Sequence, residues 1–183
     1  MTQLVGICGS LRRASLNGHL LRAATQLMPQ GAHLTAAGLH DIPLYNGDVE
    51  ADSGIPPAVT RLKDQIAAAQ GLLLVSPEYN HSVPGVLKNA IDWLSRPPAD
   101  SARVFAGRPV AVAGASPSAF GTVLAQNAWL PIVRSLRMQL WTGDRLLLSH
   151  AYRAFNADGM LVDAETENRL RTFLEGFVRF VER

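Results

Sequence analysis

The chain has 183 residues, of which 48% are hydrophobic, and its formal net charge is +2 at pH 7. This length and composition predict a single domain over residues 1–183 with a sizeable buried core. The mild charge, without any block of like charges, argues against a nucleic-acid-binding surface, and no apolar run approaches the ~18 to 20 residues of a membrane span.

Short apolar runs alternate with helical patterns along the whole chain. The strand-like runs cover residues 3–8, 33–38, 71–76, 109–114 and 137–141, with a continuation at 145–149. The helical patterns cover residues 17–28, 56–69, 84–96, 120–136 and 163–182. The third and fourth runs are continuously apolar, as in parallel strands that are covered on both faces. We therefore expect an α/β fold, a doubly wound five-stranded parallel sheet with helices on both faces.

Ligands of such sheets bind where strands end and helices begin, and the first of these turns reads GSLRRASLN over residues 9–17. A helix start leaves unpaired N–H groups and a partial positive charge, which together attract phosphate. Ser10, Ser15 and Asn17 add side-chain hydrogen bonds to this arrangement, and Arg12 adds a charge. The alternative is that Ser15 or Asn17 only caps the helix while the arginines are solvated. Neither G-x-G-x-x-G nor G-x-x-x-x-G-K-[ST] is present, which argues against a dinucleotide or a nucleoside triphosphate here.

The second turn reads SPEYNHSVPG over residues 76–85 and carries two prolines, an aromatic residue and several polar groups. Its fixed φ angles predict a rigid loop, whose outward N–H groups suit a flat heterocycle with carbonyl and ring-nitrogen acceptors. Each side chain also has a plainer interpretation. Glu78 is either solvated or a helix-start anion, Tyr79 packs on its neighbours, and His81 is exposed. The third turn, GASPSAFG over residues 114–121, lies at the same predicted edge of the sheet.

Other features are interpreted as scaffold. The helix at 163–182 has one apolar stripe and Asp163 as its cap, so it should pack on the sheet. The single cysteine, Cys8, ends an apolar strand and should be buried and inert, which agrees with a reducing compartment. Pro131 predicts a kink or a break in its helix. The sequence shows no arrangement of serine, histidine and acid that is typical of a hydrolase, and no cluster of histidine and cysteine that is typical of a metal site.

At the first two turns the sequence resembles the NADPH-dependent FMN reductase family, which has a flavodoxin-like fold and includes quinone, chromate and azo-dye reductases. GSLRRASLNG at 9–18 resembles its phosphate loop, G-S-x-R-x-x-S-x-N. SPEYNHSVPGVLKNAIDWLSR at 76–96 resembles its flavin-ring loop and following helix, P-E-Y-N-x-S-x-P-x-x-L-K-N-A-I-D-W. The order and separation of the motifs also match, and DIPLYNGD at 41–48 is a weaker match.

The resemblance implies an FMN site at the three turns, with the phosphate at the first turn and the isoalloxazine ring at the second and third. The residues implied are Ser10, Arg12, Ser15, Leu16 and Asn17 for the phosphate turn, Pro77, Glu78, Tyr79, Asn80 and Ser82 for the ring, and Ser116 from the third turn. After Ser116 the resemblance weakens, since Leu124 stands where similar members often carry an arginine.

The function implied is hydride transfer from NADPH or NADH to FMN, and then two electrons to a small-molecule acceptor such as a quinone, chromate, an azo compound or free flavin. The flavin itself accepts the hydride and passes on the electrons, so no catalytic side chain is needed. The alternative is a flavodoxin-like electron carrier or a flavin-binding sensor without turnover. Such carriers usually meet basic partners through an acidic surface, which a net charge of +2 fits poorly.

The resemblance further implies a homodimer or homotetramer. The helix at 84–96 is a candidate for part of the subunit contact, because Trp93 lies off its main apolar face and would otherwise be exposed. The alternative is that Trp93 packs under a long loop at 96–108. With no secretory signal at the start of the sequence, a cytoplasmic location is expected.

Overall fold

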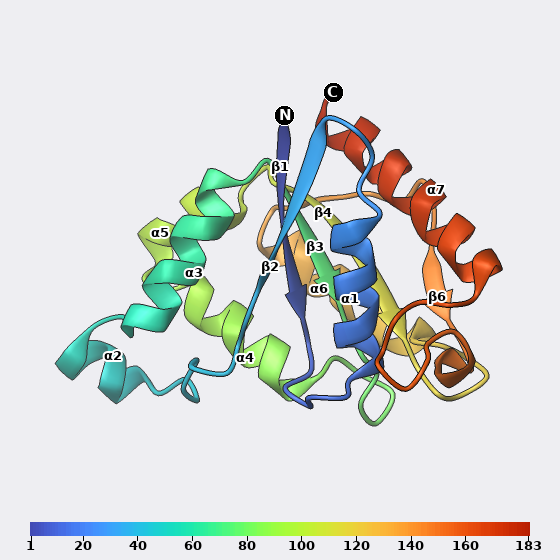
Figure 1. Ribbon diagram of the computed structural model, residues 1–183. Coiled ribbons are helices and arrows are strands. Elements are labelled where there is room, and N and C mark those ends of the chain that lie inside the picture. Colours follow the sequence, from blue (N-terminus) through green and yellow to red (C-terminus); the bar gives the residue numbers. More distant parts are fainter.

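Six parallel strands form one twisted sheet in the computed structural model, which describes residues 1–183 (Figure 1). Along the sheet the order is β2-β1-β3-β4-β5, and β6 also pairs with β4. This is the strand order of flavodoxin-like doubly wound folds, and it confirms the expected fold class. The strands are β1 (Thr2–Cys8), β2 (Ala32–Ala37), β3 (Gly71–Val75), β4 (Pro109–Ala115), β5 (Gln139–Leu140) and β6 (Leu146–Leu148).

The fifth position of the sheet is shared by two short strands. β5 pairs with Pro109 and Val110 of β4, and β6 pairs with residues 113–115 further along the same strand. The expected continuation at 145–149 is therefore confirmed. The expected strand at 137–141 begins too early, because Arg137 is left-handed (φ 57°) and the Met138 N–H donates to the Val133 carbonyl at 3.1 Å. This is a helix-terminating motif, so residues 137 and 138 close the preceding helix.

Six of the seven α-helices cover the two faces of the sheet, and α2 projects away from it (Figure 1). α1 and α7 lie on one face, α3, α4, α5 and α6 lie on the other, and α2 has no buried residue. Leu73 and Val75 point into the first core, whereas Leu72 and Leu74 point into the second, which explains why this run is continuously apolar. The helices are α1 (Leu16–Gln26), α2 (Gly47–Ser53), α3 (Pro57–Ala68), α4 (Gly85–Leu94), α5 (Pro98–Phe105), α6 (Val123–Ser135) and α7 (Ala164–Val181).

Two helices were not expected from the sequence. α5 occupies most of the segment 96–108, which was expected to be a loop, and it carries Pro98 at its start and Asp100 in its first turn. α2 begins after Asn46, whose side chain accepts a hydrogen bond from the Asp48 N–H at 2.9 Å. α6 continues through Pro131 to Ser135, so the expected break is absent.

Trp93 is fully buried, so the expectation that it would be exposed in a single copy is wrong, and this residue gives no support to a subunit contact at the helix 84–96. Its indole N–H donates to the Pro43 carbonyl at 2.9 Å, and the Tyr45 ring packs edge-on at 4.9 Å between centroids. The segment before α2 therefore covers this residue. The helical pattern was correct, but a cover supplied from fifty positions earlier in the chain has no local signal.

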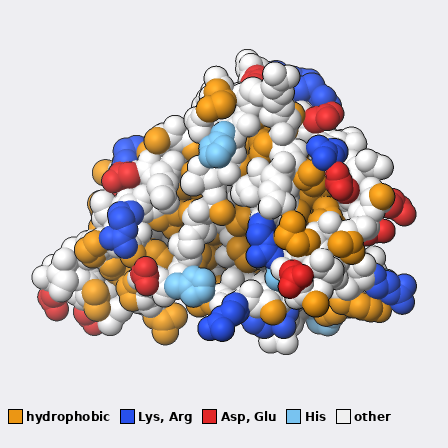
Figure 2. All heavy atoms as spheres, viewed as in Figure 1, with side chains coloured by type: hydrophobic (Ala, Val, Ile, Leu, Met, Phe, Trp, Pro, Cys, Tyr) orange, Lys and Arg blue, Asp and Glu red, His pale blue; other side chains and the backbone are white.

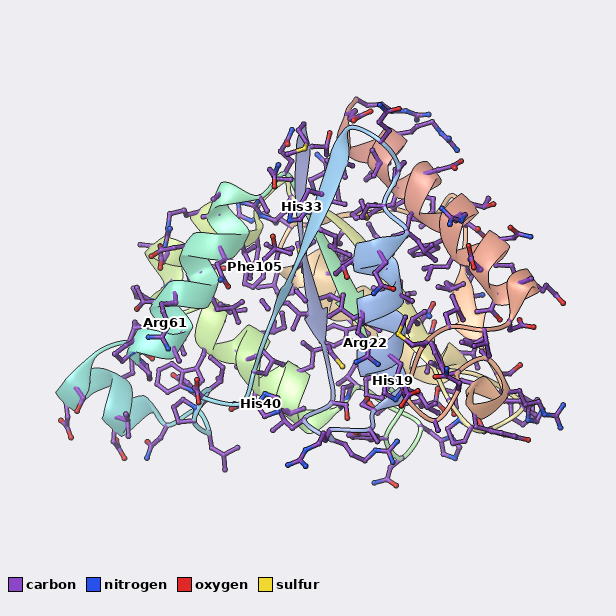
Figure 3. All side chains as sticks on the ribbon, viewed as in Figure 1. His19, Arg22, His33, His40, Arg61 and Phe105 are labelled. Atoms are coloured by element: carbon purple, nitrogen blue, oxygen red, sulfur yellow. The ribbon has the colours of Figure 1, made fainter.

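A loop before α7 is held against α1 by two neighbouring side chains, His19 and Arg22 (Figure 3). The Arg22 guanidinium is 2.8 Å from His19 Nδ1 and donates to the carbonyls of Asp158 and Gly159. Burial lowers the pKa of His19, and the charge of Arg22 lowers it further. These contacts fix α1, which begins at the first predicted ligand-binding turn.

The surface carries charges of both signs. Figure 2 shows basic and acidic side chains interspersed with apolar ones over the face on which α1, α3 and β2 lie. None of the helices combines the length and the apolar character needed to cross a membrane.

Candidate functional site

The turns after β1, β3 and β4 meet at the carboxyl ends of these neighbouring strands and enclose a cleft of about 430 Å³. This is the edge at which open α/β sheets bind ligands, and the volume lies within the usual range for ligand pockets. The cleft is lined by Ser10, Arg12, Ser15, Leu16, Asn17, Pro77, Glu78, Tyr79, Ala115, Ser116 and Pro117. Every residue implied by the motifs lies in this lining except Asn80 and Ser82.

The first turn combines a helix cap with free hydrogen-bond donors. The Ser15 hydroxyl accepts from the Gly18 N–H at 3.3 Å, so the capping interpretation of Ser15 is correct. The Ser10 hydroxyl accepts from the Arg12 N–H at 3.3 Å. The N–H groups of Leu16 and Asn17, at the start of α1, have no partner in the chain. Unpartnered N–H groups at a helix start are suited to an anion.

Asn17 has a different environment from the other residues of this turn. Its side chain is buried, with 4% exposed, and its amide nitrogen donates to the Ala115 carbonyl at 2.7 Å. The amide oxygen accepts from the Ala115 N–H at 2.9 Å. Both ends of the amide are thus bonded to β4, and the side chain joins the first turn to the third.

Residues 79–82 form a tight hairpin in the second turn. Tyr79 and Ser82 exchange two main-chain hydrogen bonds of 3.1 Å, and Asn80 and His81 have φ angles of 50° and 62°. Positive φ at both central positions is the signature of a type I′ turn, and asparagine tolerates it well. This turn places Asn80 and Ser82 beyond the lining of the cleft.

Glu78 joins the second turn to the start of α6. Its Oε2 accepts from the N–H groups of Leu124 and Ala125 at 2.9 and 3.0 Å, and its Oε1 lies 3.5 Å from His81 Nδ1. Glu78 is therefore a helix-start anion, as one of its two plainer interpretations held, but not a local one. The helix concerned is α6, whereas the interpretation referred to α4, which follows the turn directly.

The two sides of the cleft approach each other closely. The Tyr79 hydroxyl donates to the Ser10 hydroxyl at 3.3 Å. A Cβ on Gly9 would lie 2.8 Å from Pro84 and 2.9 Å from Pro77, so glycine is needed at this approach. Cys8 lies beneath the first turn, where burial raises the pKa of its thiol. It is half-buried rather than fully buried.

The third turn is held from the side of β6. The Ser116 N–H donates to the Leu148 carbonyl at 2.9 Å, and its hydroxyl lies 2.9 Å from that of Ser118. Ala115 and Pro117 also line the cleft and were not singled out from the sequence. Neither carries a functional side chain, so their only signal was their position beside Ser116. The structure brings no three histidine, cysteine, aspartate or glutamate side chains together as a metal site.

The model of the NADPH-dependent FMN reductase family matches residues 2–153, which include all three turns of the cleft. The chain belongs to the NADPH-dependent FMN reductase family. The resemblance found in the two loop motifs is thereby confirmed.

Named relatives of this reductase align over almost their whole length. It is 42% identical over 181 residues to an NAD(P)H-dependent FMN reductase of Pseudomonas aeruginosa, covering 99% of this chain and 96% of the relative. It is 38% identical over 175 residues to a 2-hydroxy-1,4-benzoquinone reductase of a Burkholderia species, with 96% and 93% covered. Among solved structures, FerB, a flavoenzyme NAD(P)H:(acceptor) oxidoreductase of Paracoccus denitrificans, superposes with a TM-score of 0.88 at 34% identity, covering 100% of this chain and 98% of FerB.

The cleft of this reductase fits the cofactor of its family. The first turn supplies hydroxyl groups, Arg12 and the unpartnered N–H groups of Leu16 and Asn17, which suit a phosphate. The second turn supplies the aromatic ring of Tyr79 and the rigid Pro77, which suit a flat ring system.

Proposed function

We propose that this chain binds FMN in the cleft between its three turns and uses NAD(P)H to reduce a quinone. The observation that carries the proposal is the pairing of two surfaces across one cleft. A hydroxyl-bearing helix start with unpartnered N–H groups faces a rigid loop that carries an aromatic residue. When bound, FMN supplies the hydride-transfer chemistry, and the protein supplies binding, orientation and electrostatics.

In this proposal, the phosphate of FMN is bound by the first turn. Ser10 and Ser15 offer hydroxyl groups, and Arg12 offers a positive charge that no acid of the chain neutralises. Asn17 contributes its main-chain N–H, since its side-chain amide is committed to Ala115. The dipole of α1 adds to the same attraction.

The ring is bound by the second and third turns. Pro77 fixes the loop, and Tyr79 presents its ring to the cleft. The main-chain N–H groups of Glu78 and Asn80 have no partner in the chain and are offered to negative charge beside the ring, whereas the Tyr79 N–H donates to the Ser82 carbonyl. Ser116 approaches from β4. Asn80 and Ser82, which the resemblance also assigns to the ring, lie in the hairpin of the second turn, outside the lining of the cleft.

A quinone is proposed as the acceptor because relatives with 35–38% identity over almost the whole chain are named quinone reductases. Chromate, azo compounds and free flavin are further proposed acceptors of the same site. The proposal includes a homo-oligomer in the cytoplasm. Apolar side chains beside the cleft support self-association, since Phe120 is 79% exposed and Leu124 is 45% exposed.

The test is a visible spectrum of the purified protein after incubation with FMN and desalting, followed by anaerobic addition of NADPH. Retained flavin that bleaches, together with steady-state NADPH oxidation driven by 1,4-benzoquinone, is the expected result. Retained flavin without turnover would instead indicate the electron carrier or the sensor. If flavin is lost on desalting, an equilibrium titration of FMN fluorescence decides, and absence of binding there overturns the proposal.

A further inference from the structure

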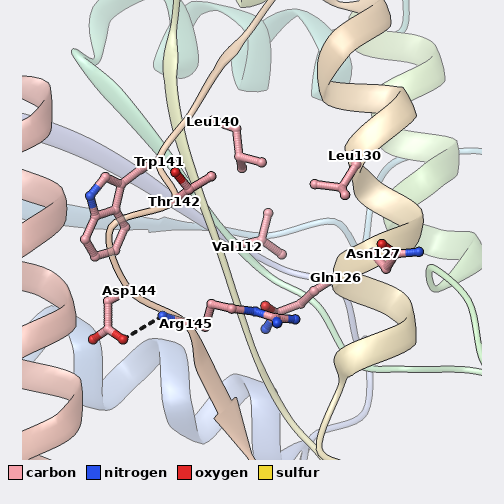
Figure 4. Close-up of a pocket in the computed structure, with 9 residues that line it drawn as sticks. All are labelled: Val112, Gln126, Asn127, Leu130, Leu140, Trp141, Thr142, Asp144 and Arg145. Atoms are coloured by element: carbon pink, nitrogen blue, oxygen red, sulfur yellow. Dashed lines mark hydrogen bonds between the residues drawn. The ribbon is translucent and has the colours of Figure 1, made fainter.

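A second hollow lies at the far edge of the sheet, between α6 and the segment that joins β5 to β6 (Figure 4). Its volume is about 220 Å³, and its lining includes Val112 of β4, Leu130 of α6 and, from the segment around β5, Leu140, Trp141, Thr142, Asp144 and Arg145. We call it the edge pocket. No residue that lines the FMN cleft lines the edge pocket.

One half of the edge pocket is apolar. Figure 4 shows Leu130 and Leu140 facing each other across its upper end, with Val112 below them. These side chains come from α6, β5 and β4, which the core packing holds in place. Such walls favour a ligand with an apolar body, because burial of apolar surface is the general driving force of binding in pockets.

The other half is polar and carries one positive charge, on Arg145, and one negative charge, on Asp144. Figure 4 shows Arg145 beside Gln126 at the lower end of the pocket. The Arg145 guanidinium has no hydrogen-bond or ion-pair partner in the chain, and neither does the amide of Asn127. The neighbouring acid, Asp144, accepts only from the Arg145 main-chain N–H, at 2.7 Å. The charge of the guanidinium is therefore available to a ligand.

The floor of the pocket is fixed in position. Gln126 is buried, and its Nε2 donates to the Leu146 carbonyl at 3.0 Å and to the Thr122 hydroxyl at 3.3 Å. These bonds hold α6 against β6, on either side of the pocket. A preformed site loses less free energy on binding than one that must be ordered.

We propose that the edge pocket binds a small organic carboxylate, with its apolar body between Leu130 and Leu140 and its carboxylate paired with Arg145. A planar guanidinium matches a carboxylate through two parallel hydrogen bonds. A single arginine beside apolar walls suits a monoanion rather than a multiply charged phosphate ester. The volume lies below the ~300 to 1,000 Å³ of pockets for drug-sized ligands, so the ligand has about ten non-hydrogen atoms. The proposal does not depend on FMN binding at the other site.

Benzoate has this size and chemistry, and it serves as the probe. Its binding to the full-length protein is measured by calorimetry and by two-dimensional NMR, with and without FMN. Saturable binding that shifts the amide signals of Leu140 and Thr142 is expected in both cases. Arg145→Gln should weaken binding at least about tenfold, because it removes the charge-assisted hydrogen bonds to the carboxylate. Neutral benzamide should bind at least about tenfold more weakly than benzoate.

Arg169→Gln is the matched control, because it removes the same charge from an exposed position on α7 and should leave benzoate binding unchanged. Leu130→Glu is a second variant, which places a negative charge in the apolar half and should also abolish binding. Displacement of benzoate by FMN would assign it to the other cleft and overturn the proposal. So would equal binding to Arg145→Gln, or no saturable binding of benzoate to the folded protein.

Discussion

Asn17 and Ala115 exchange two hydrogen bonds where α1 meets the end of β4. The Asn17 amide donates to the Ala115 carbonyl at 2.7 Å and accepts from the Ala115 N–H at 2.9 Å. Both residues are buried, so water cannot replace either bond. The side chain of Asn17 therefore positions the proposed phosphate turn relative to the third turn of the cleft.

Replacing Asn17 by alanine should lower the free energy of unfolding by about 3 kcal/mol, because it leaves a buried N–H and a buried carbonyl without partners. Asn17→Asp keeps the acceptor but turns a buried carboxylate oxygen towards the Ala115 carbonyl, so at pH 7 its effect should be no smaller. Urea denaturation measures both. Ser10→Ala, which removes only one hydroxyl at the cleft, should change stability by less than about 1 kcal/mol. Equal stabilities for Asn17→Ala and Ser10→Ala would refute the positioning role.

Two adjacent arginines provide a matched pair for the phosphate site. Arg12 lines the cleft and Arg13 does not, although both are exposed and carry the same charge. Arg12→Gln should weaken FMN binding about tenfold or more through loss of a charge-assisted hydrogen bond. Arg13→Gln should leave the dissociation constant within about twofold. Fluorescence titration of FMN gives both values, and equal losses would mean that only the overall charge matters.

Glu78→Ala should loosen the first turn of α6, because two N–H groups lose their acceptor and the helix start loses its counter-charge. Hydrogen exchange at Leu124 and Ala125 should accelerate about tenfold, and FMN affinity should fall because the second turn loses its anchor. His81→Ala keeps the carboxylate bonded to α6 and is the control. Unchanged exchange at Leu124 in Glu78→Ala would show that the cap contributes no stability.

Much of the site was predictable because its signals are local. The cap at Ser15 and the free N–H groups after it follow from a serine before an apolar helical pattern. The same holds for the rigid second turn, where Pro77 and Pro84 are visible in the sequence. The meeting of the three turns followed from strand order alone, since the carboxyl ends of parallel strands share one edge.

The roles of Asn17 and Glu78 could not be predicted in the same way. The partner of Asn17 is 98 positions away and that of Glu78 is 46 positions away, and in both cases the partner is main chain. Since almost every residue has a main-chain N–H and a carbonyl, the residue type of such a partner gives no signal in the sequence. Trp93 shows the same limit, since its cover depends on the fold of the segment at Pro43. α5 is different, because Pro98 and Asp100 were sufficient local signals for a helix start.

Away from the cleft, Lys63 is fully buried between α3 and α5, where its ammonium lies 3.0 Å from Asp100 and donates to the Arg96 carbonyl. Asp100 also accepts from Arg103 at 2.7 Å. The bond from Arg103, followed by that from Lys63, lowers the pKa of Asp100 from 3.8 to about 2. A lowered pKa means that the folded state favours the charged carboxylate. The resulting stabilisation is complete above about pH 4 and is lost as the pH falls towards about 2.

Asp100→Asn should therefore lower the free energy of unfolding at pH 7 by about 2 kcal/mol, because it leaves the buried Lys63 charge without its counter-ion. Between about pH 4 and pH 2 the variant should lose less stability than the parent protein, since it has no carboxylate to protonate at this position. Urea denaturation at a series of pH values measures both effects. Asp64→Asn is the control, because Asp64 pairs with Arg103 from an exposed position and should contribute less than about 1 kcal/mol. If the free energy of unfolding fell equally in Asp100→Asn and in the parent protein between about pH 4 and pH 2, Asp100 would not be responsible for the acid sensitivity.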